Sequence, residues 1–292
     1  MDSRERAILK TLLYADLFDY PLREEEIYKF LIADKKTEKG EFREVLKKIK
    51  IPIGLSKGFF FLSERRELIK EREKKEKISL EKLKKAKKII KRLSLIPTAS
   101  LIGISGALSM KNSDKDDDID IFVISKKGFA WTTRFLLVTL LSIFGVYRNR
   151  GSKNYSDKIC LNMILDESCM SFGKNSQDIY TAHEIVQLLP IFDREKTYER
   201  FVKENFWVKN FIPNFLINKN YSRKRSSIFN KLLILLLRAL FLEKTSKFLQ
   251  LNYMKGHITK EVVEDGFLKF HPFDYKTYVL KAYNKRLSQY GL

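Results

Sequence analysis

Two aspartates form the group of residues in this sequence best suited to chemistry. Asp118 and Asp120 stand two positions apart, where an acidic loop runs into the apolar segment that ends at Ile124. In an extended strand alternate side chains share a face, so both carboxylates are expected to point to one spot. Two carboxylates so close repel each other unless a cation lies between them, and hard divalent ions take oxygen ligands of this kind. The pair therefore predicts a site for Mg²⁺ or Mn²⁺.

A turn of small residues, Ser105, Gly106 and Ala107, precedes the aspartates, and Ser109 follows it. Glycine lets the backbone approach a ligand closely, and the amide N–H groups of such a turn are donors for phosphate oxygens. Together with a metal ion, the turn could hold a nucleoside triphosphate for in-line phosphoryl transfer. The expected nucleotide contacts are these four residues and Lys158, a cation at the start of a later strand.

With this strand, turn and acidic pair, the chain resembles the nucleotidyltransferase superfamily of the DNA polymerase β type. The signature of that family is a Gly-Ser turn, a gap of about ten residues, and Asp-x-Asp inside an apolar strand. The resemblance covers residues 98–125 and extends more loosely to about residue 190. It implies transfer of a nucleoside monophosphate from an NTP to an acceptor, with Mg²⁺ on Asp118 and Asp120. Nucleic-acid ends, protein hydroxyls and small molecules all serve as acceptors across the superfamily.

The sequence departs from the family pattern at two positions. Ala107 replaces the serine of the turn. The family places a third carboxylate on a later strand, but the expected strand, 159–165, offers Asn162 as its one strongly polar interior residue. Asn162 is thus the predicted third catalytic residue, and Asp157 and Asp166 at the strand ends are the other candidates. An inactive nucleotidyltransferase fold that binds nucleotide or nucleic acid remains the alternative.

The elements that must position this site indicate an α+β fold. Apolar strands are expected at 101–104, 119–124 and 159–165, with a helix at 129–147 between the second and the third. The near-continuous apolar character of the second strand is typical of a central position in a sheet. We expect a catalytic core with a mixed sheet and helices over residues 98–190.

Residues 1–70 show the pattern of a winged-helix-like domain, with three amphipathic helices followed by a hairpin. The third helix and its end carry Arg43, Lys47, Lys48 and Lys50, which suit phosphate groups. They include no Asn or Gln that would read bases, so a structural or non-specific role is favoured over a DNA-binding regulator.

The remaining regions are a basic helical connector at 71–97 and a helical C-terminal region at 191–292. Two apolar runs, Phe135–Val146 and Leu232–Leu237, are shorter than the roughly 18–20 residues that a membrane-spanning helix needs. Both are expected to be buried helices. Peripheral membrane contact remains possible for the second run, which follows the basic segment 223–225.

The net charge of +21 is unevenly distributed over the 292 residues. Residues 51–100 hold 15 Lys and Arg against 6 Asp and Glu, and residues 201–250 hold 10 against 2, while 101–200 hold 13 of each sign. Basic surfaces flanking a neutral centre attract nucleic acid or anionic lipid headgroups. A lysine-rich background that only solvates surface helices is the other interpretation.

The cysteine and histidine content argues against a disulfide-stabilised protein and against a structural zinc site. Cys160 and Cys169 show no pairing pattern, so reduced thiols are expected. With three scattered histidines, a structural zinc site is not expected. The charged first turn does not resemble a signal peptide. Together these features predict a cytoplasmic protein.

Overall fold

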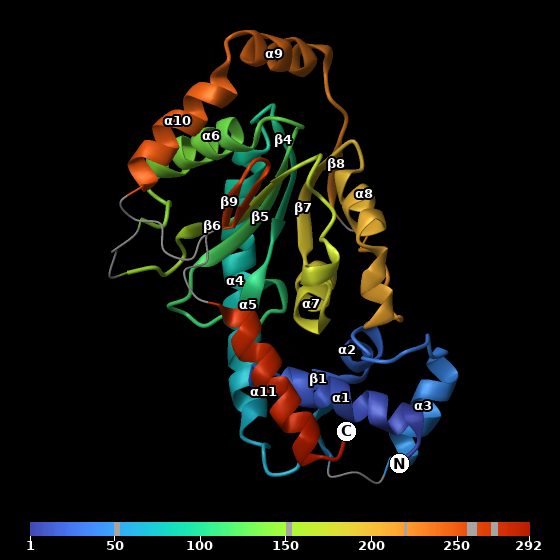
Figure 1. Ribbon diagram of the computed structural model, residues 1–292. Helices are drawn as coiled ribbons and strands as arrows, with labels where there is room; N and C mark the ends of the chain where they lie inside the picture. Colours follow the sequence, from blue (N-terminus) through green and yellow to red (C-terminus); the bar gives the residue numbers. More distant parts are fainter. Residues whose placement is uncertain (50–52, 150–153, 219–220, 256–261, 270–273) are drawn as a thin grey trace.

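The computed structural model describes most of the chain, in six segments: residues 1–49, 53–149, 154–218, 221–255, 262–269 and 274–292. Over these segments the chain is α+β, with eleven α-helices, a seven-stranded mixed sheet and a three-stranded antiparallel sheet. Figure 1 shows the large sheet in the middle, the N-terminal helices at one end and α9 at the other. The predicted α+β class is confirmed.

The N-terminal part contains three helices and three short strands: α1 (Ser3–Asp16), β1 (Leu22–Arg23), α2 (Glu24–Lys29), α3 (Lys39–Lys48), β2 (Ile53–Ser56) and β3 (Phe59–Leu62). The strands pair antiparallel in the order β1-β3-β2. A capping box starts α1, because the Asp2 carboxylate accepts from the amide of Glu5 and the Glu5 carboxylate accepts from the amide of Asp2. The predicted order of three helices and a hairpin is observed.

The predicted connector is one continuous helix, α4 (Leu68–Leu93). One face packs inward through side chains at helical spacing, namely Leu83, Ala86, Ile90 and Leu93. The turn after α4 is fastened by the buried Arg194 guanidinium, which donates to the carbonyls of Ala99 (2.8 Å), Ile96 (3.3 Å) and Ser94 (3.2 Å). These bonds fix where the first strand of the central sheet begins.

Seven strands make the central sheet: β4 (Ala99–Ile104), β5 (Ile119–Ser125), β6 (Ile159–Asp166), β7 (Leu189–Arg194), β8 (Ser222–Lys224), β9 (Val262–Glu264) and β10 (Phe267–Lys269). Their order is β8-β7-β4-β5-β6-β10-β9. β4 runs antiparallel to β5 and β7, whereas β5 and β6 are parallel and are joined through α6 (Ala130–Ile143). The three strands expected at the core are present, and β5 is central, as its apolar sequence predicts.

The C-terminal region is less purely helical than expected. Its helices are α8 (Thr197–Glu204), α9 (Ile228–Ala239), α10 (Leu242–Met254) and α11 (Tyr275–Gln289). The strands β7, β8, β9 and β10 nevertheless join the central sheet from this part of the chain. Three of these strands have only three residues, too few for an alternating pattern to be visible in the sequence. Pairing with longer neighbours stabilises them.

The two apolar runs behave differently. In α6, Leu137 and Leu141 are buried, although Phe135 and Ile143 are exposed. The second run lies in α9, and no residue of α9 is buried, so the prediction of a second buried helix is wrong. In the part of the chain that the structure describes, its outer side, with Leu232, Leu235 and Leu236, stays exposed. None of the helices in the described segments is long and apolar enough to cross a membrane.

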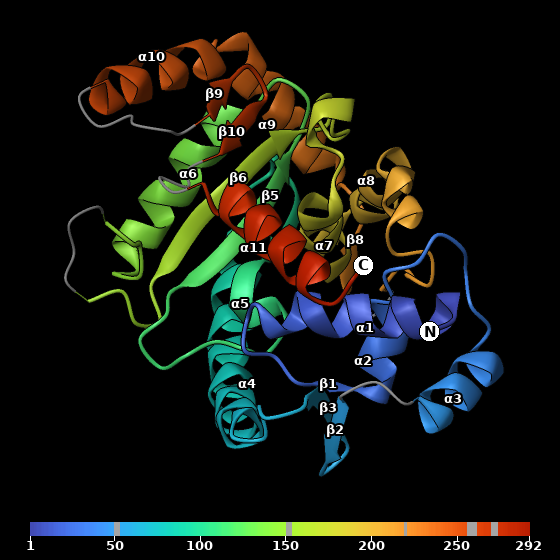
Figure 2. The same cartoon turned by 60° about the horizontal axis from the view of Figure 1, so that its bottom comes forward.

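The N-terminal part is attached to the central sheet by buried polar contacts. The fully buried Arg72 guanidinium donates to the Tyr20 hydroxyl (2.7 Å) and pairs with Glu26 (3.1 Å). The Tyr20 hydroxyl lies 2.7 Å from the carbonyl of Met110, in the loop that leads to the aspartate pair. Figure 2 shows α11 beside α1 and α7 (Ile179–Gln187), against both of which it packs. The N-terminal part therefore forms one wall around the site.

Candidate active site

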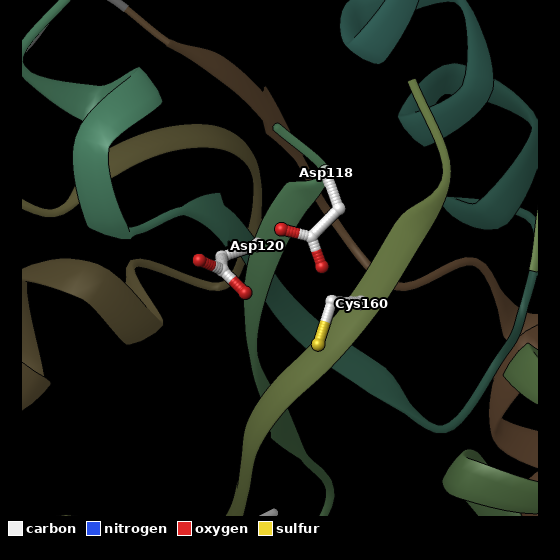
Figure 3. A group of neighbouring side chains, drawn as sticks. All are labelled: Asp118, Asp120 and Cys160. Atoms are coloured by element: carbon white, nitrogen blue, oxygen red, sulfur yellow. The ribbon is translucent and has the colours of Figure 1, made fainter. Parts of the chain in front are cut away.

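The two aspartates and one cysteine come together at the start of β5. Asp118 immediately precedes the strand, and Asp120 lies within it. The parallel register places Cys160 of β6 opposite Asp120. One ligand atom from each of these three residues lies within 4.8 Å of the others, and Figure 3 shows the two carboxylates and the thiol grouped on neighbouring strands. As predicted, the aspartates face one spot.

The Asp120 carboxyl is in an unfavourable position for a negative charge. Its Oδ1 atom is buried and has no hydrogen-bond partner among the described residues. Burial, and then the neighbouring Asp118 charge, raise the pKa of Asp120 to about 7. A cation between the two carboxylates would remove both penalties, because it replaces the lost hydration and offsets the repulsion.

Arg148 already supplies one positive charge at the edge of this group. Its guanidinium forms an ion pair with Asp118, lies 4.4 Å from the centre of the Tyr155 ring, and approaches the Cys160 sulfur at 3.7 Å. Asp120 is not part of that ion pair. The arrangement thus neutralises the outer aspartate, whereas the inner one forms no ion pair within the described residues.

The donor set at this spot fits a hard divalent ion. Asp118 and Asp120 offer carboxylate oxygens, and the amide oxygen of Asn162 is buried with no hydrogen-bond partner. Burial, followed by the two aspartate charges, raises the pKa of the Cys160 thiol well above its usual range. Because oxygen atoms outnumber the single sulfur in this set, it suits Mg²⁺ or Mn²⁺ better than a soft metal.

The Gly106 turn approaches Asp120 more closely than any other residue type would allow. Its φ is +61°, in the left-handed region, and a Cβ atom there would lie 2.6 Å from Asp120 Oδ2. The amide of Ser105 donates to the Asp120 carbonyl at 3.0 Å. Turn and aspartate are therefore one packed unit, although more than ten residues separate them in sequence.

A cavity of about 530 Å³ opens beside this unit. Five of the predicted site residues line it: Gly106, Ala107, Asp118, Asp120 and Asn162. Asn162 is buried and lies where the pairing of β5 with β6 is irregular, between Leu161 and Met163. The structure thus brings together the turn, the aspartate pair and the residue predicted to replace the third carboxylate.

Three other predicted residues do not line the cavity. The Ser105 hydroxyl accepts a hydrogen bond from the Asn162 amide (3.2 Å), and the Ser109 hydroxyl donates to the Gly106 carbonyl (2.8 Å). The Lys158 ammonium donates to the Gly145 carbonyl (2.8 Å). Ser105 thus orients Asn162 and Ser109 fastens the turn, while Lys158 supports the loop after α6.

The acids at the ends of β6 are engaged elsewhere. Asp157 pairs with Lys82 (3.6 Å) and with Lys85. The Asp166 carboxylate accepts from the amides of Gly128 (2.9 Å) and Ser168 (2.7 Å) at the other end of the strand. Neither residue lines the cavity, so neither supplies a third carboxylate there.

Helix α7 brings a carboxylate that the sequence analysis did not select. Glu184 is partly buried and lines the cavity. Burial raises its pKa, and its charge is close enough to add to the raised pKa of Asp120. The available signal was an acid on a helix whose neighbours Ala182, Ile185 and Val186 form an apolar stripe.

The neighbouring His183 has a structural environment, as expected. It is buried, stacks on Tyr14 with ring centroids 3.9 Å apart, and its Nδ1 lies 2.9 Å from the carbonyl of Ile179. Burial lowers the pKa of His183 to about 4, so the ring is neutral at pH 7. It forms part of the cavity wall and carries no charge there.

The cations predicted to meet phosphates on α3 are paired with acids of the N-terminal part. Arg43 pairs with Glu24 (2.6 Å), and Glu44 pairs with Lys48 (3.4 Å) and Lys47 (4.0 Å). The fourth residue of that set, Lys50, lies outside the described residues. Exposed pairs of this kind are weak, but they lower the positive potential of the helix.

Comparisons of the chain with protein-family models, with curated proteins and with solved structures found no match. Function must therefore be inferred from the side chains themselves. The features available for that inference are the aspartate pair, the Gly106 turn, Glu184 and the shape of the cavity.

Proposed function

We propose that this protein is a metal-dependent nucleotidyltransferase that transfers a nucleoside monophosphate from an NTP to an acceptor. The observation that carries the proposal is the contact between the Gly106 turn and Asp120, with Asp118 beside them, at the wall of a cavity. An ordinary surface loop has no reason to bury a carboxylate oxygen without a partner. A site that binds a cation and phosphate groups does.

Asp118 and Asp120 would hold the ion, Mg²⁺ or Mn²⁺. When bound, such an ion supplies positive charge to the phosphate oxygens and offsets the charge that develops on them. The backbone amides of Gly106 and Ala107, at the cavity wall, are donors for the same phosphates. Asn162, oriented by its bond to Ser105, offers a neutral oxygen at the position of the usual third acid.

Glu184 is the candidate general base for the acceptor. A base must accept a proton from the attacking hydroxyl, and its pKa is best when burial brings it closer to neutral. Burial raises the pKa of Glu184, which is the direction that this role requires. Glu184 also lines the same cavity as Asp120. A neutral Asn162 cannot act as this base, so Glu184 supplies what the strand lacks.

The cavity also suggests how a substrate is held. Aromatic side chains line it from three directions: Tyr14, Phe18 and Tyr20 from the N-terminal part, Tyr180 from α7 and Tyr275 from α11. Aromatic faces stack on planar groups such as nucleobases, and a volume of this order accommodates a ligand the size of a nucleotide. In this proposal the winged-helix-like part serves as a wall of the nucleotide pocket.

A second candidate is a nucleotide-binding protein without transfer activity. It is favoured by the ion pair between Arg148 and Asp118, which satisfies one of the two carboxylates without a metal. Ala107 and Asn162, at positions where the family has a hydroxyl and a carboxylate, favour the same interpretation.

The test combines binding and transfer. Each NTP is titrated into the protein with and without Mg²⁺ or Mn²⁺, and labelled NTPs are then incubated with nucleic-acid, protein and small-molecule acceptors. Asp118→Asn and Asp120→Asn should abolish metal-dependent binding and transfer. The matched control is Asp116→Asn, which alters an exposed carboxylate of the same loop outside the cavity, and it should behave as wild type.

Three outcomes separate the candidates. Metal-dependent binding with label transfer supports the enzyme. Nucleotide binding without transfer to any acceptor, whether or not it needs the metal, supports the binding protein. Absence of nucleotide binding under all conditions contradicts both. For nucleic acid as acceptor, affinity should fall steeply with salt and show no preference of sequence.

A further inference from the structure

Helix α9 carries an apolar face that the rest of the described chain leaves open. Five large hydrophobic side chains of α9, and the two that directly follow the helix, are between 53% and 79% exposed: Ile228, Phe229, Leu232, Leu235, Leu236, Leu240 and Phe241. Isolated exposed apolar residues are normal on a protein surface, but a contiguous group marks an interaction site.

These side chains lie on one side of the helix. Leu232 follows Ile228 by four residues, and Leu235 and Leu236 follow Leu232 by three and four, which is the repeat of a single helix face. The remaining apolar residues of the run, Leu233, Ile234 and Leu237, are less exposed. The helix therefore has an open apolar face and a partly covered one, as expected of an element that lies on a surface.

Helix α10 anchors this face to the body of the protein. Its inner side buries Gln250, whose amide donates to the carbonyl of Trp131 in α6 at 2.9 Å. Glu243 at its start accepts from the amides of Trp131 (2.9 Å) and Thr132 (2.8 Å). On its outer side Phe248 and Leu249 are exposed, so α10 adds exposed apolar side chains to those of α9.

The surroundings of the apolar face are strongly basic. Residues 222–249 carry seven Lys and Arg and one acid, Glu243, whose carboxylate is directed to α6. Within the described segments, four of the cations form no ion pair: Arg225, Lys231, Arg238 and Lys244. Arg238 lies 5.5 Å from the centre of the Phe129 ring, and the charge of Lys231 helps to lower the pKa of Glu195. Lys231 and Arg238 are seven residues apart, so they lie along the same edge of α9.

We infer that α9 and the start of α10 form an interfacial helix pair that binds an anionic membrane surface. An apolar face bordered by cations matches such a surface, since the side chains enter the acyl boundary and the cations meet the headgroups. A second copy of this chain is disfavoured by charge, because two equal basic patches and net charges of +21 repel. Nucleic acid would match the cations and leave the apolar face uncovered.

The position of the helix pair fits this role and is independent of the proposed catalysis. Figure 1 shows α9 at the end of the molecule opposite α1 and α3. The nucleotide cavity is lined partly by α1, so it lies toward the other end. Binding of α9 to a membrane would leave the cavity open to water and to soluble substrates.

The experiment is flotation of the full chain with vesicles of phosphatidylcholine, alone or mixed with phosphatidylglycerol. Binding to the anionic vesicles should exceed binding to the neutral ones by about tenfold or more, and should weaken with added salt. Leu232→Glu/Leu236→Glu should lower anionic-vesicle binding by about tenfold or more, because it places charge in the apolar face. The matched control is Leu55→Glu/Leu95→Glu, which alters leucines that are 62% and 74% exposed outside the patch and should bind as wild type.

Several results would overturn the inference. Equal binding by the α9 variant and the control would show that the apolar face is not used. Concentration-dependent dimers in sedimentation, lost in the α9 variant and without vesicle binding, would assign the face to a second copy. Tight nucleic-acid binding lost in the α9 variant, without vesicle binding, would assign the patch to that partner. Thermal unfolding checks that the variant is folded, and Asp120→Asn should bind vesicles as wild type whatever its catalytic result.

Discussion

The two ends of the molecule depart from the ordinary rules of burial in opposite ways. At the cavity, carboxyl groups are withdrawn from water, with Asp120 Oδ1 buried and unpartnered and the pKa of Glu184 raised by burial. At α9, leucine and phenylalanine side chains remain in water. Buried charge and exposed apolar surface both cost free energy in the isolated chain.

This difference indicates which kind of ligand would stabilise each end of the molecule. Buried like charges are stabilised by a cation, so the cavity end is complementary to a metal ion and phosphate groups. Exposed apolar side chains bordered by lysine and arginine are stabilised by an apolar phase with anionic headgroups. Features that the fold leaves unsatisfied thus point to two different ligands, and each can be tested without disturbing the other.

The largest expected effect is on the cavity end. Asp120→Asn should reduce nucleotidyl transfer by about 10³-fold, equivalent to several kcal/mol of lost charge stabilisation. The metal-free variant should unfold at or above the temperature of the wild type, because the repulsion with Asp118 is removed. Transfer assays and calorimetry measure the two quantities. A variant that is strongly destabilised without metal would mean that the carboxylate has a structural role.

The next largest effect is on the free energy of unfolding, where a leucine of α6 and a leucine of α9 should differ. Leu137→Ala in α6 removes a fully buried side chain and should lower the free energy of unfolding by about 3 kcal/mol. Leu236→Ala in α9 should change it by less than about 0.5 kcal/mol, because its side chain is already half in water. Denaturant titration of both variants measures the difference. Equal losses would contradict an open apolar face on α9.

Alanine substitutions at two glycines with similar backbone conformations test whether the close approach of the Gly106 turn to Asp120 is needed. Gly106 and Gly128 both have positive φ, so alanine strains the backbone at either position. Only at Gly106 does the new Cβ meet Asp120, whereas nothing lies within 4 Å at Gly128. Gly106→Ala should lower transfer by about 10²-fold, and Gly128→Ala should leave it unchanged. Similar activity in the two variants would show that the approach of the turn to Asp120 is not needed.

The smallest expected effect is on the pH dependence of the free energy of unfolding. Burial lowers the folded-state pKa of His183 to about 4, below the ordinary value of 6.5. The stabilisation by the neutral ring is thus complete above pH 6.5 and is lost as the pH falls toward 4. Between pH 7 and pH 5 the wild type should lose about 2 kcal/mol more stability than His183→Phe, which retains a ring beside Tyr14. Unfolding curves at both pH values provide the measurement, and parallel losses would place His183 in contact with water.

Much of the site was predictable because its elements are local. The apolar runs that form β4, β5 and β6 have the length and composition of buried strands, and the i, i+2 spacing places both aspartates on one face. The Gly106 turn was recognisable from its small residues. Glu184 was not recognisable, because an acid on an amphipathic helix is usually solvated, and only the tertiary packing of α7 brings it into the cavity.

By itself the sequence determined the local features: the α+β composition, the central strand, the shared face of Asp118 and Asp120, and the net charge of +21. Tertiary structure alone decided which polar groups meet there, placing Cys160 and Asn162 beside the pair and turning Lys158 away to the Gly145 carbonyl. It also decided that α6 is covered and α9 is not, although both are apolar. Burial depends on whether another element faces the helix, and that information is non-local in the chain.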